Sequence, residues 1–168
     1  MRAWFFLVLL VGCVTVPPVA YEFPLHFTAL QVVEMKGREG NLTLLATLDR
    51  DGKHFTAVFL DAVLQRPLIR LEYDAHGFRE TRLSDLAISS EDAQWIMGGI
   101  VKMFERRDFR AEGAALVGSA DGVAYSLRDW EGPPACRRPR VIEWTLDRRG
   151  PLVIRVENRE FECLPAKA

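Results

Sequence analysis

The stretch "NLTLLATLDRDGKHFTAVFL", residues 41–60, decides the fold because it holds two alternating apolar runs with a turn between them. Alternation of apolar and polar residues predicts strands with one buried face. The buried set of the first run is Leu42, Leu44, Ala46 and Leu48, and that of the second is Phe55, Ala57 and Phe59. Between the runs, Asp51-Gly52 is a strong signal for a two-residue hairpin. We therefore predict an antiparallel hairpin that places Leu48 opposite Phe55.

A second hairpin follows from "VIEWTLDRRGPLVIRVEN", residues 141–158, where a loop with a glycine separates two alternating runs. Matching the apolar faces places Trp144 opposite Ile154. Extending this register sets Cys136 opposite residue 162, one position short of Cys163. A bulge near Pro139 would align the two sulfurs, so we expect either a disulfide between these cysteines or two free buried thiols.

The rest of the chain adds strands at about 27–35, 68–73, 78–83 and 123–128, with turn residues between them. A helix is expected from Ser89 onward, where Ser-Ser-Glu-Asp is a capping signature. Its apolar stripe is Ile96, Ile100, Met103 and Phe104. Gly98-Gly99 either lets this helix approach a sheet closely or ends it early.

These elements predict a mainly β fold with one or two helices and about eight to ten strands. A strongly curved antiparallel sheet, an incomplete β-barrel wrapped on a helix, accommodates the helix well. An immunoglobulin-like sandwich is the competing architecture, although it leaves no natural place for a central helix.

The N-terminus looks like a secretory signal, with Arg2 followed by a short apolar run. This run is too short for a transmembrane helix, which needs about 20 apolar residues. Leu10-Val11-Gly12-Cys13 resembles the bacterial lipobox, which implies cleavage between Gly12 and Cys13 and acylation of Cys13, with palmitate among the acyl groups. The alternative is an ordinary signal cut later, after Ala20. Val14 follows the cysteine, which in lipoproteins of this type implies the periplasmic face of the outer membrane of a Gram-negative bacterium.

The expected organisation is a signal peptide at residues 1–12, a lipidated tether at 13–22 and one β domain at 23–168. The chain has 49% hydrophobic residues and a formal net charge of −1. This composition argues against disorder, and the absence of a basic excess argues against nucleic acid as a partner. We expect a monomer attached to the membrane through its lipid anchor.

Candidate catalytic groups are sparse, so we expect no enzymatic activity, cofactor or metal site. His26, His54 and His76 lie in separate turn or strand-edge contexts. The sequence has no Gly-x-Ser-x-Gly, Cys-x-x-Cys or His-Glu-x-x-His motif and no glycine-rich phosphate loop.

Two loops draw attention for their composition. Pairing Phe59 with Ile69 makes residues 62–66 a connecting loop, and loops are normally polar. Val63 and Leu64 at its tip are expected either to fold back on the core or to touch a membrane or hydrophobic client. Beside Cys136, the cluster of Arg137, Arg138 and Arg140 is either a solvated loop or a contact for an acidic partner or lipid headgroups.

The span from residue 53 to 104 resembles the middle of LolB, the outer-membrane lipoprotein that receives other lipoproteins from the carrier LolA. The order of strand, short loop with a leucine, strand and capped helix is carried by "HFTAVFLDAVLQRPLIRLEYD" and "SSEDAQWIMGGIVKMF". The family loop Asn-Pro-Leu-Gly reads Ala-Val-Leu-Gln here, with its leucine at Leu64. A set of uncharacterised LolB-related lipoproteins is more similar still.

This resemblance implies a LolA/LolB-like fold with a hydrophobic cavity for acyl chains. The expected lining residues are Phe55, Phe59, Leu71, Tyr73, Trp144 and Ile154, for which plain core packing is the alternative. The implied function is binding or transfer of lipid or lipoprotein acyl chains in envelope biogenesis, with a periplasmic carrier protein as a partner. The alternative is a structural accessory subunit of an envelope complex that binds no lipid.

Overall fold

One antiparallel sheet and one long helix form the fold in the computed structural model, which describes residues 19–37, 40–84, 88–106, 108–120, 122–147 and 151–165. The sheet has eleven strands. They are β1 (Val19–Ala20), β2 (His26–Gly37), β3 (Gly40–Asp51), β4 (His54–Asp61), β5 (Pro67–Asp74), β6 (Gly77–Arg82), β7 (Asp108–Glu112), β8 (Ala115–Ala120), β9 (Val123–Glu131), β10 (Arg138–Asp147) and β11 (Pro151–Cys163). Helix α1 spans Ser90–Glu105, and a short 3₁₀ turn, η1, spans Pro134–Cys136.

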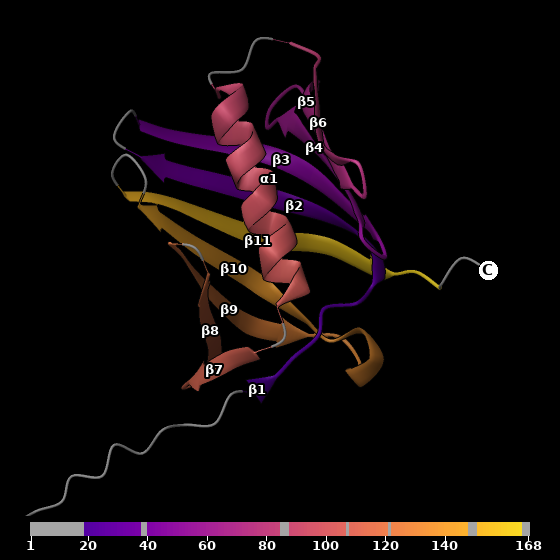
Figure 1. Ribbon diagram of the computed structural model, residues 1–168, viewed down its shortest axis with the longest axis vertical. Coiled ribbons are helices and arrows are strands. Elements are labelled where there is room, and N and C mark those ends of the chain that lie inside the picture. Colours follow the sequence, from indigo (N-terminus) through magenta and orange to yellow (C-terminus); the bar gives the residue numbers. More distant parts are fainter. Residues whose placement is uncertain are drawn as a thin grey trace, which may run out of the picture.

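The sheet is assembled from two meanders, β2–β6 and β7–β11, joined where β11 pairs with β2. The strand order is β1-β7-β8-β9-β10-β11-β2-β3-β4-β5-β6. Its ends, β1 and β6, do not pair with each other, so the sheet stays open. Figure 1 shows α1 crossing one face of the sheet over β2 and β11. The expected incomplete barrel wrapped on a helix is therefore confirmed, and the immunoglobulin-like sandwich is excluded.

Alternation along the central strands creates the buried layer beneath α1. In β2, buried and half-buried residues alternate from His26 to Met35. Every second residue is likewise buried from Leu44 to Arg50 in β3 and from Phe55 to Phe59 in β4. Because successive side chains point to opposite faces of a sheet, one apolar set is buried against the helix.

Helix α1 begins where the capping signature predicts. The Ser89 hydroxyl accepts a hydrogen bond from the Asp92 backbone N–H at 3.1 Å, and Arg106 ends the helix with an extended backbone. The Gly98-Gly99 pair does not end the helix. A Cβ atom at Gly99 would lie 3.8 Å from the indole ring of Trp144, whereas one at Gly98 would meet nothing within 4 Å. Gly99 therefore marks a close approach of helix backbone to sheet.

Two of the predicted pairings are confirmed. Trp144 pairs with Ile154 between β10 and β11, and Phe59 pairs with Ile69 between β4 and β5. The loop of the β10–β11 hairpin, residues 148–150, lies outside the described residues.

The predicted register of the first hairpin is wrong by two residues, because Leu48 pairs with Ala57 instead of Phe55. The neighbouring strand β2 explains the shift. The Gly52 N–H donates to the Leu25 carbonyl at 2.8 Å, which keeps Asp51 within the sheet and moves the turn to residues 52–53. Gly52, with φ +64°, then occupies the first central position, as in a type II′ turn. A shift of two preserves the face of every side chain.

Residues 19–22, expected in the tether, belong to the fold. β1 pairs with β7, and the Tyr21 ring packs edge-on against Phe23 and Trp130. The Tyr21 hydroxyl donates to the Arg137 carbonyl at 2.9 Å. Burial raises the pKa of this phenol, with Arg137 opposing the shift. The packed domain thus begins before residue 23.

The predicted disulfide joins Cys136 and Cys163, whose Cα atoms lie 6.0 Å apart. The irregularity that aligns the cysteines lies in β11, level with Pro139 as expected. The register of β11 against β2 shifts between Asn158 and Glu160, and the Asn158 amide contacts the Pro139 carbonyl at 2.7 Å. One extra residue in β11 brings position 163 level with position 136.

Candidate functional site

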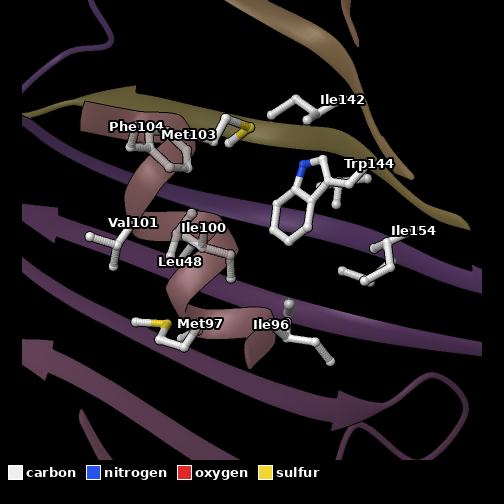
Figure 2. Close-up of a cluster of buried hydrophobic side chains, with 14 of the residues drawn as sticks. Leu48, Ile96, Met97, Ile100, Val101, Met103, Phe104, Ile142, Trp144 and Ile154 are labelled. Carbon is white, nitrogen blue, oxygen red and sulfur yellow. The ribbon is translucent and has the colours of Figure 1, made fainter. Parts of the chain in front are cut away.

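The candidate site is the apolar layer between α1 and the concave face of the sheet. It encloses one small cavity of about 20 Å³. The lining residues are Gln31, Val33, Met35, Ala46, Leu48, Ala57, Phe59, Ile96, Ile100, Met103, Phe104, Ile142, Trp144, Ile154 and Val156. Figure 2 shows the helix side chains Ile96, Ile100 and Met103 facing Trp144 and Ile154 of the sheet.

Three of the six residues expected to line an acyl-chain cavity do line this one: Phe59, Trp144 and Ile154. Phe55 and Leu71 are buried in the core without lining the cavity. Tyr73 is half-buried and packs against the core, also without lining the cavity. Ligand pockets generally measure about 300–1,000 Å³. In this conformation the interior is packed like an ordinary protein core, so an acyl chain requires α1 to move away from the sheet.

The β4–β5 loop presents the second feature of the site. Val63 is 86% exposed and Leu64 63% exposed, so neither side chain folds back on the core. We call Val63 and Leu64 the apolar tip. Backbone hydrogen bonds join Asp61 N–H to the Arg66 carbonyl at 2.9 Å and Gln65 N–H to the Asp61 carbonyl at 3.0 Å. The apolar tip is therefore carried on a hydrogen-bonded loop.

The carboxylate of Asp61 forms two hydrogen bonds within this loop. Its Oδ1 accepts hydrogen bonds from the backbone N–H of Val63 at 2.9 Å and of Leu64 at 2.6 Å. The hydrogen bond from Leu64, followed by that from Val63, lowers the pKa of Asp61 below its ordinary value. Because a carboxylate accepts these bonds more strongly than a neutral carboxyl does, the ionised form holds the loop best.

A buried arginine that sequence reasoning missed connects three parts of the structure. Arg50 is 6% exposed, and its Nη1 donates to the carbonyls of Pro24 at 3.1 Å and Phe104 at 3.3 Å. Its Nε donates to the Gly52 carbonyl at 3.0 Å. Burial lowers the pKa of the guanidinium, with Glu105 opposing the shift. Arg50 thereby ties the last turn of α1 to the N-terminal segment and the β3–β4 turn.

A second buried polar group lies at the irregular point of β11. The Asn158 amide donates to the Pro139 carbonyl at 2.7 Å, and its oxygen accepts from Gln31 Nε2 at 2.8 Å. These contacts join β2, β11 and β10. These polar residues occupy inward-facing positions of their strands, an even number of residues from buried apolar neighbours; they are Arg50, Gln31 and Asn158. This alternating position is the sequence signal that could have revealed their burial.

The arginine cluster beside Cys136 has partners within the chain. The Arg137 guanidinium lies over the Trp130 ring, 5.3 Å from its centroid, and that of Arg138 lies over the Phe161 ring, 5.1 Å from its centroid. Arg140 Nη2 forms an ion pair with Glu157 Oε1 at 3.1 Å. The hydrogen bond to Glu157 raises the pKa of Arg140. The cluster thus contacts β9 and β11 at the surface, where Arg137 and Arg140 remain exposed.

The histidines do not converge. His26 pairs with Asp51 at 2.8 Å and His54 contacts the Thr56 hydroxyl at 3.3 Å, both at exposed positions. Within the described ranges, no group of three or more His, Cys, Asp and Glu residues is arranged to hold a metal ion. Over the same ranges, no helix is long and apolar enough to cross a membrane.

The expected lipidation site, Gly12 and Cys13, lies outside the described residues together with the rest of the N-terminal 18. No protein-family model matches this chain, and neither does any curated protein.

Proposed function

We propose that this chain is a lipid-anchored, non-enzymatic module that binds or transfers acyl chains of lipids or lipoproteins at the periplasmic face of the outer membrane. The observation that carries the proposal is the apolar tip. Val63 and Leu64 are held in solvent by a hydrogen-bonded loop, where they contribute no burial to folding. Exposed apolar groups of this kind gain free energy only by contact with an apolar partner.

The composition of the interior supports the same proposal. Met35, Met97 and Met103 are all buried between α1 and the sheet. Methionine side chains are unbranched and adaptable, so they can repack around a guest. An acyl chain gains about 0.8 kcal/mol for each buried methylene, and this gain would offset the separation of α1 from the sheet. The LolB-like order of elements and the lipobox-like sequence at Cys13 agree with this role.

The test compares Leu64→Glu with a matched variant. Leu25→Glu alters a leucine that is 55% exposed near the β3–β4 turn, at the opposite end of β4. The full chain, inserted in vesicles by its own anchor, is mixed with a fluorescent peptide bearing an S-diacylglyceryl cysteine. Leu64→Glu should slow uptake of the peptide at least about tenfold, since burial of a leucine contributes about 1.5–3 kcal/mol. Leu25→Glu should not change the rate. Equal rates for all three proteins would refute the role of the apolar tip.

A second candidate function is favoured by the small size of the interior cavity, about 20 Å³. It is a structural accessory subunit of an envelope complex that binds no lipid. In that case the unaltered chain takes up no diacylated peptide, and native mass spectrometry of protein purified without detergent gives the protein mass alone. A stoichiometric additional mass that dissociates as an acyl species contradicts this second candidate.

A further inference from the structure

The indole nitrogen of Trp144 is a buried donor without an acceptor. Trp144 is 3% exposed on β10, between Ile154 of β11 and Tyr125 of β9. Within the described part of the chain, its Nε1–H has no hydrogen-bond partner. Buried polar groups are nearly always paired, and an unpaired one is unfavourable. The group therefore requires an explanation beyond packing.

The surroundings of Trp144 match an apolar ligand with one acceptor. The side chains that line the adjoining cavity are apolar except for Gln31 and Trp144 itself, and the Gln31 amide nitrogen is directed to Asn158. Figure 2 shows the indole within the helix–sheet layer, its nitrogen on the side of Ile142 and Met103.

Gly99 gives Trp144 a connection to the surface. The α1 backbone lies against the indole at Gly99, where no side chain separates them. The opposite side of this segment borders a surface groove lined by Trp95, Gly98, Gly99, Lys102 and residues nearby. At this point a single helix backbone separates solvent from the Cε3–Cζ3 edge of the indole, whereas the Nε1–H lies on the far edge, on the side of Ile142 and Met103.

We propose that Trp144 Nε1–H donates a hydrogen bond to the carbonyl oxygen of an esterified acyl group whose chain occupies the helix–sheet interior. This inference rests on the proposed function and specifies its ligand. Among the residues that line the cavity, none is a lysine, arginine or histidine. A free carboxylate would thus be buried without a counter-charge, which is unfavourable. A neutral ester carbonyl needs only the donor that Trp144 supplies.

The experiment uses two ligands that differ in the carbonyl. The full chain carrying Cys13→Ser, labelled with ¹⁵N at its tryptophan indoles and purified without detergent, is titrated with methyl palmitate or hexadecane. We expect both ligands to bind, and only methyl palmitate to move the Trp144 indole proton resonance downfield. Palmitate should bind more weakly than its methyl ester. This comparison needs no variant at position 144.

Trp144→Phe provides the complementary test because it keeps an aromatic ring and removes the donor. It should lower the affinity for methyl palmitate about threefold to tenfold, as expected for one hydrogen bond, and leave that for hexadecane unchanged. Trp95→Phe, at a half-buried tryptophan beside the surface groove, is the matched control and should change neither affinity.

The two proposals fail in different ways. If both ligands bind while the Trp144 resonance responds to them equally, the hydrogen bond is refuted and acyl binding stands. Tighter binding of palmitate than of its ester likewise refutes the choice of an ester. If neither ligand binds, the proposed function is refuted and this inference with it.

Discussion

Leu71 and Leu64 have the same side chain and opposite surroundings. Leu71 is 1% exposed on β5, beneath α1, whereas Leu64 is 63% exposed at the apolar tip, only a few residues earlier in the chain. The first leucine stabilises the fold by leaving water. The second is kept in water by hydrogen bonds from its own loop, so the fold gains nothing from its apolar character. The difference separates residues that specify structure from residues available for contact.

The largest effect on stability is expected from Leu71→Ala. Removal of a buried leucine side chain leaves a cavity beneath the helix, and such changes cost about 2–5 kcal/mol. Urea unfolding followed by circular dichroism should show a lower midpoint. An unfolding free energy within 1 kcal/mol of the unaltered chain would mean that the helix–sheet layer readily collapses around lost volume.

Replacing Cys136 and Cys163 by serine tests how firmly η1 is held to the end of β11. The bridge links residues separated by 27 positions, and closure of a loop of that length in the unfolded chain corresponds to about 3.5 kcal/mol. Thermal unfolding of the double variant, compared with the oxidised chain, measures this contribution. Uptake of the diacylated peptide should be unchanged at a temperature where both proteins are folded.

Arg50→Met should destabilise the chain by about 2 kcal/mol, because the carbonyls of Pro24, Gly52 and Phe104 lose a charged donor. Methionine preserves the length of the side chain, so the loss reports hydrogen bonding more than packing. Hydrogen exchange should accelerate in the last turn of α1. No change there would show that the helix end is held by its apolar face alone.

Leu64→Ala should change stability by less than about 0.5 kcal/mol, as is usual for an exposed side chain. Paired with Leu71→Ala, it applies one chemical change to two environments. We expect it to slow uptake of the diacylated peptide without shifting the urea midpoint. A loss of stability close to that of Leu71→Ala would overturn the distinction between the two leucines.

Asp61→Ala gives the smallest effect on stability and isolates the rigidity of the apolar tip. The amides of Val63 and Leu64 should exchange faster with solvent, while Asp61→Asn retains an acceptor and slows them again. For the unaltered chain, the Asp61 pKa is lowered, so its contribution is complete above the ordinary carboxyl value near 4 and is lost as the pH falls through the lowered pKa. The tip should therefore behave alike at pH 5 and 7.

Most of the fold was accessible from the sequence because its central strands alternate so regularly. The register of β4 with β5 and of β10 with β11 followed from matching apolar faces. The first hairpin was misplaced because its turn is determined partly by β2, which is not adjacent to the turn in the sequence. Strands β7 and β8 were missed, since both are short and the segments around them are interrupted by Gly113 and Gly118.

The site was less predictable because it also depends on contacts between elements that are distant in the sequence. Which apolar residues line the cavity, and which merely pack, depends on where α1 lies across the sheet. Phe55 and Phe59 share a strand face, yet only Phe59 borders the cavity. The exposure of Val63 and Leu64 likewise depended on the hydrogen bonds of Asp61, which the pattern alone did not reveal.

The pairing of β11 with β2 also governs the order in which the chain can fold. β11 fills the gap between β10 and β2 near the middle of the sheet, although it is the last strand along the chain. Until it emerges, both meanders have an open edge of unpaired backbone, the kind of surface that promotes aggregation. A chain truncated before residue 151 should therefore be a substrate for proteases and chaperones, however complete its other strands are.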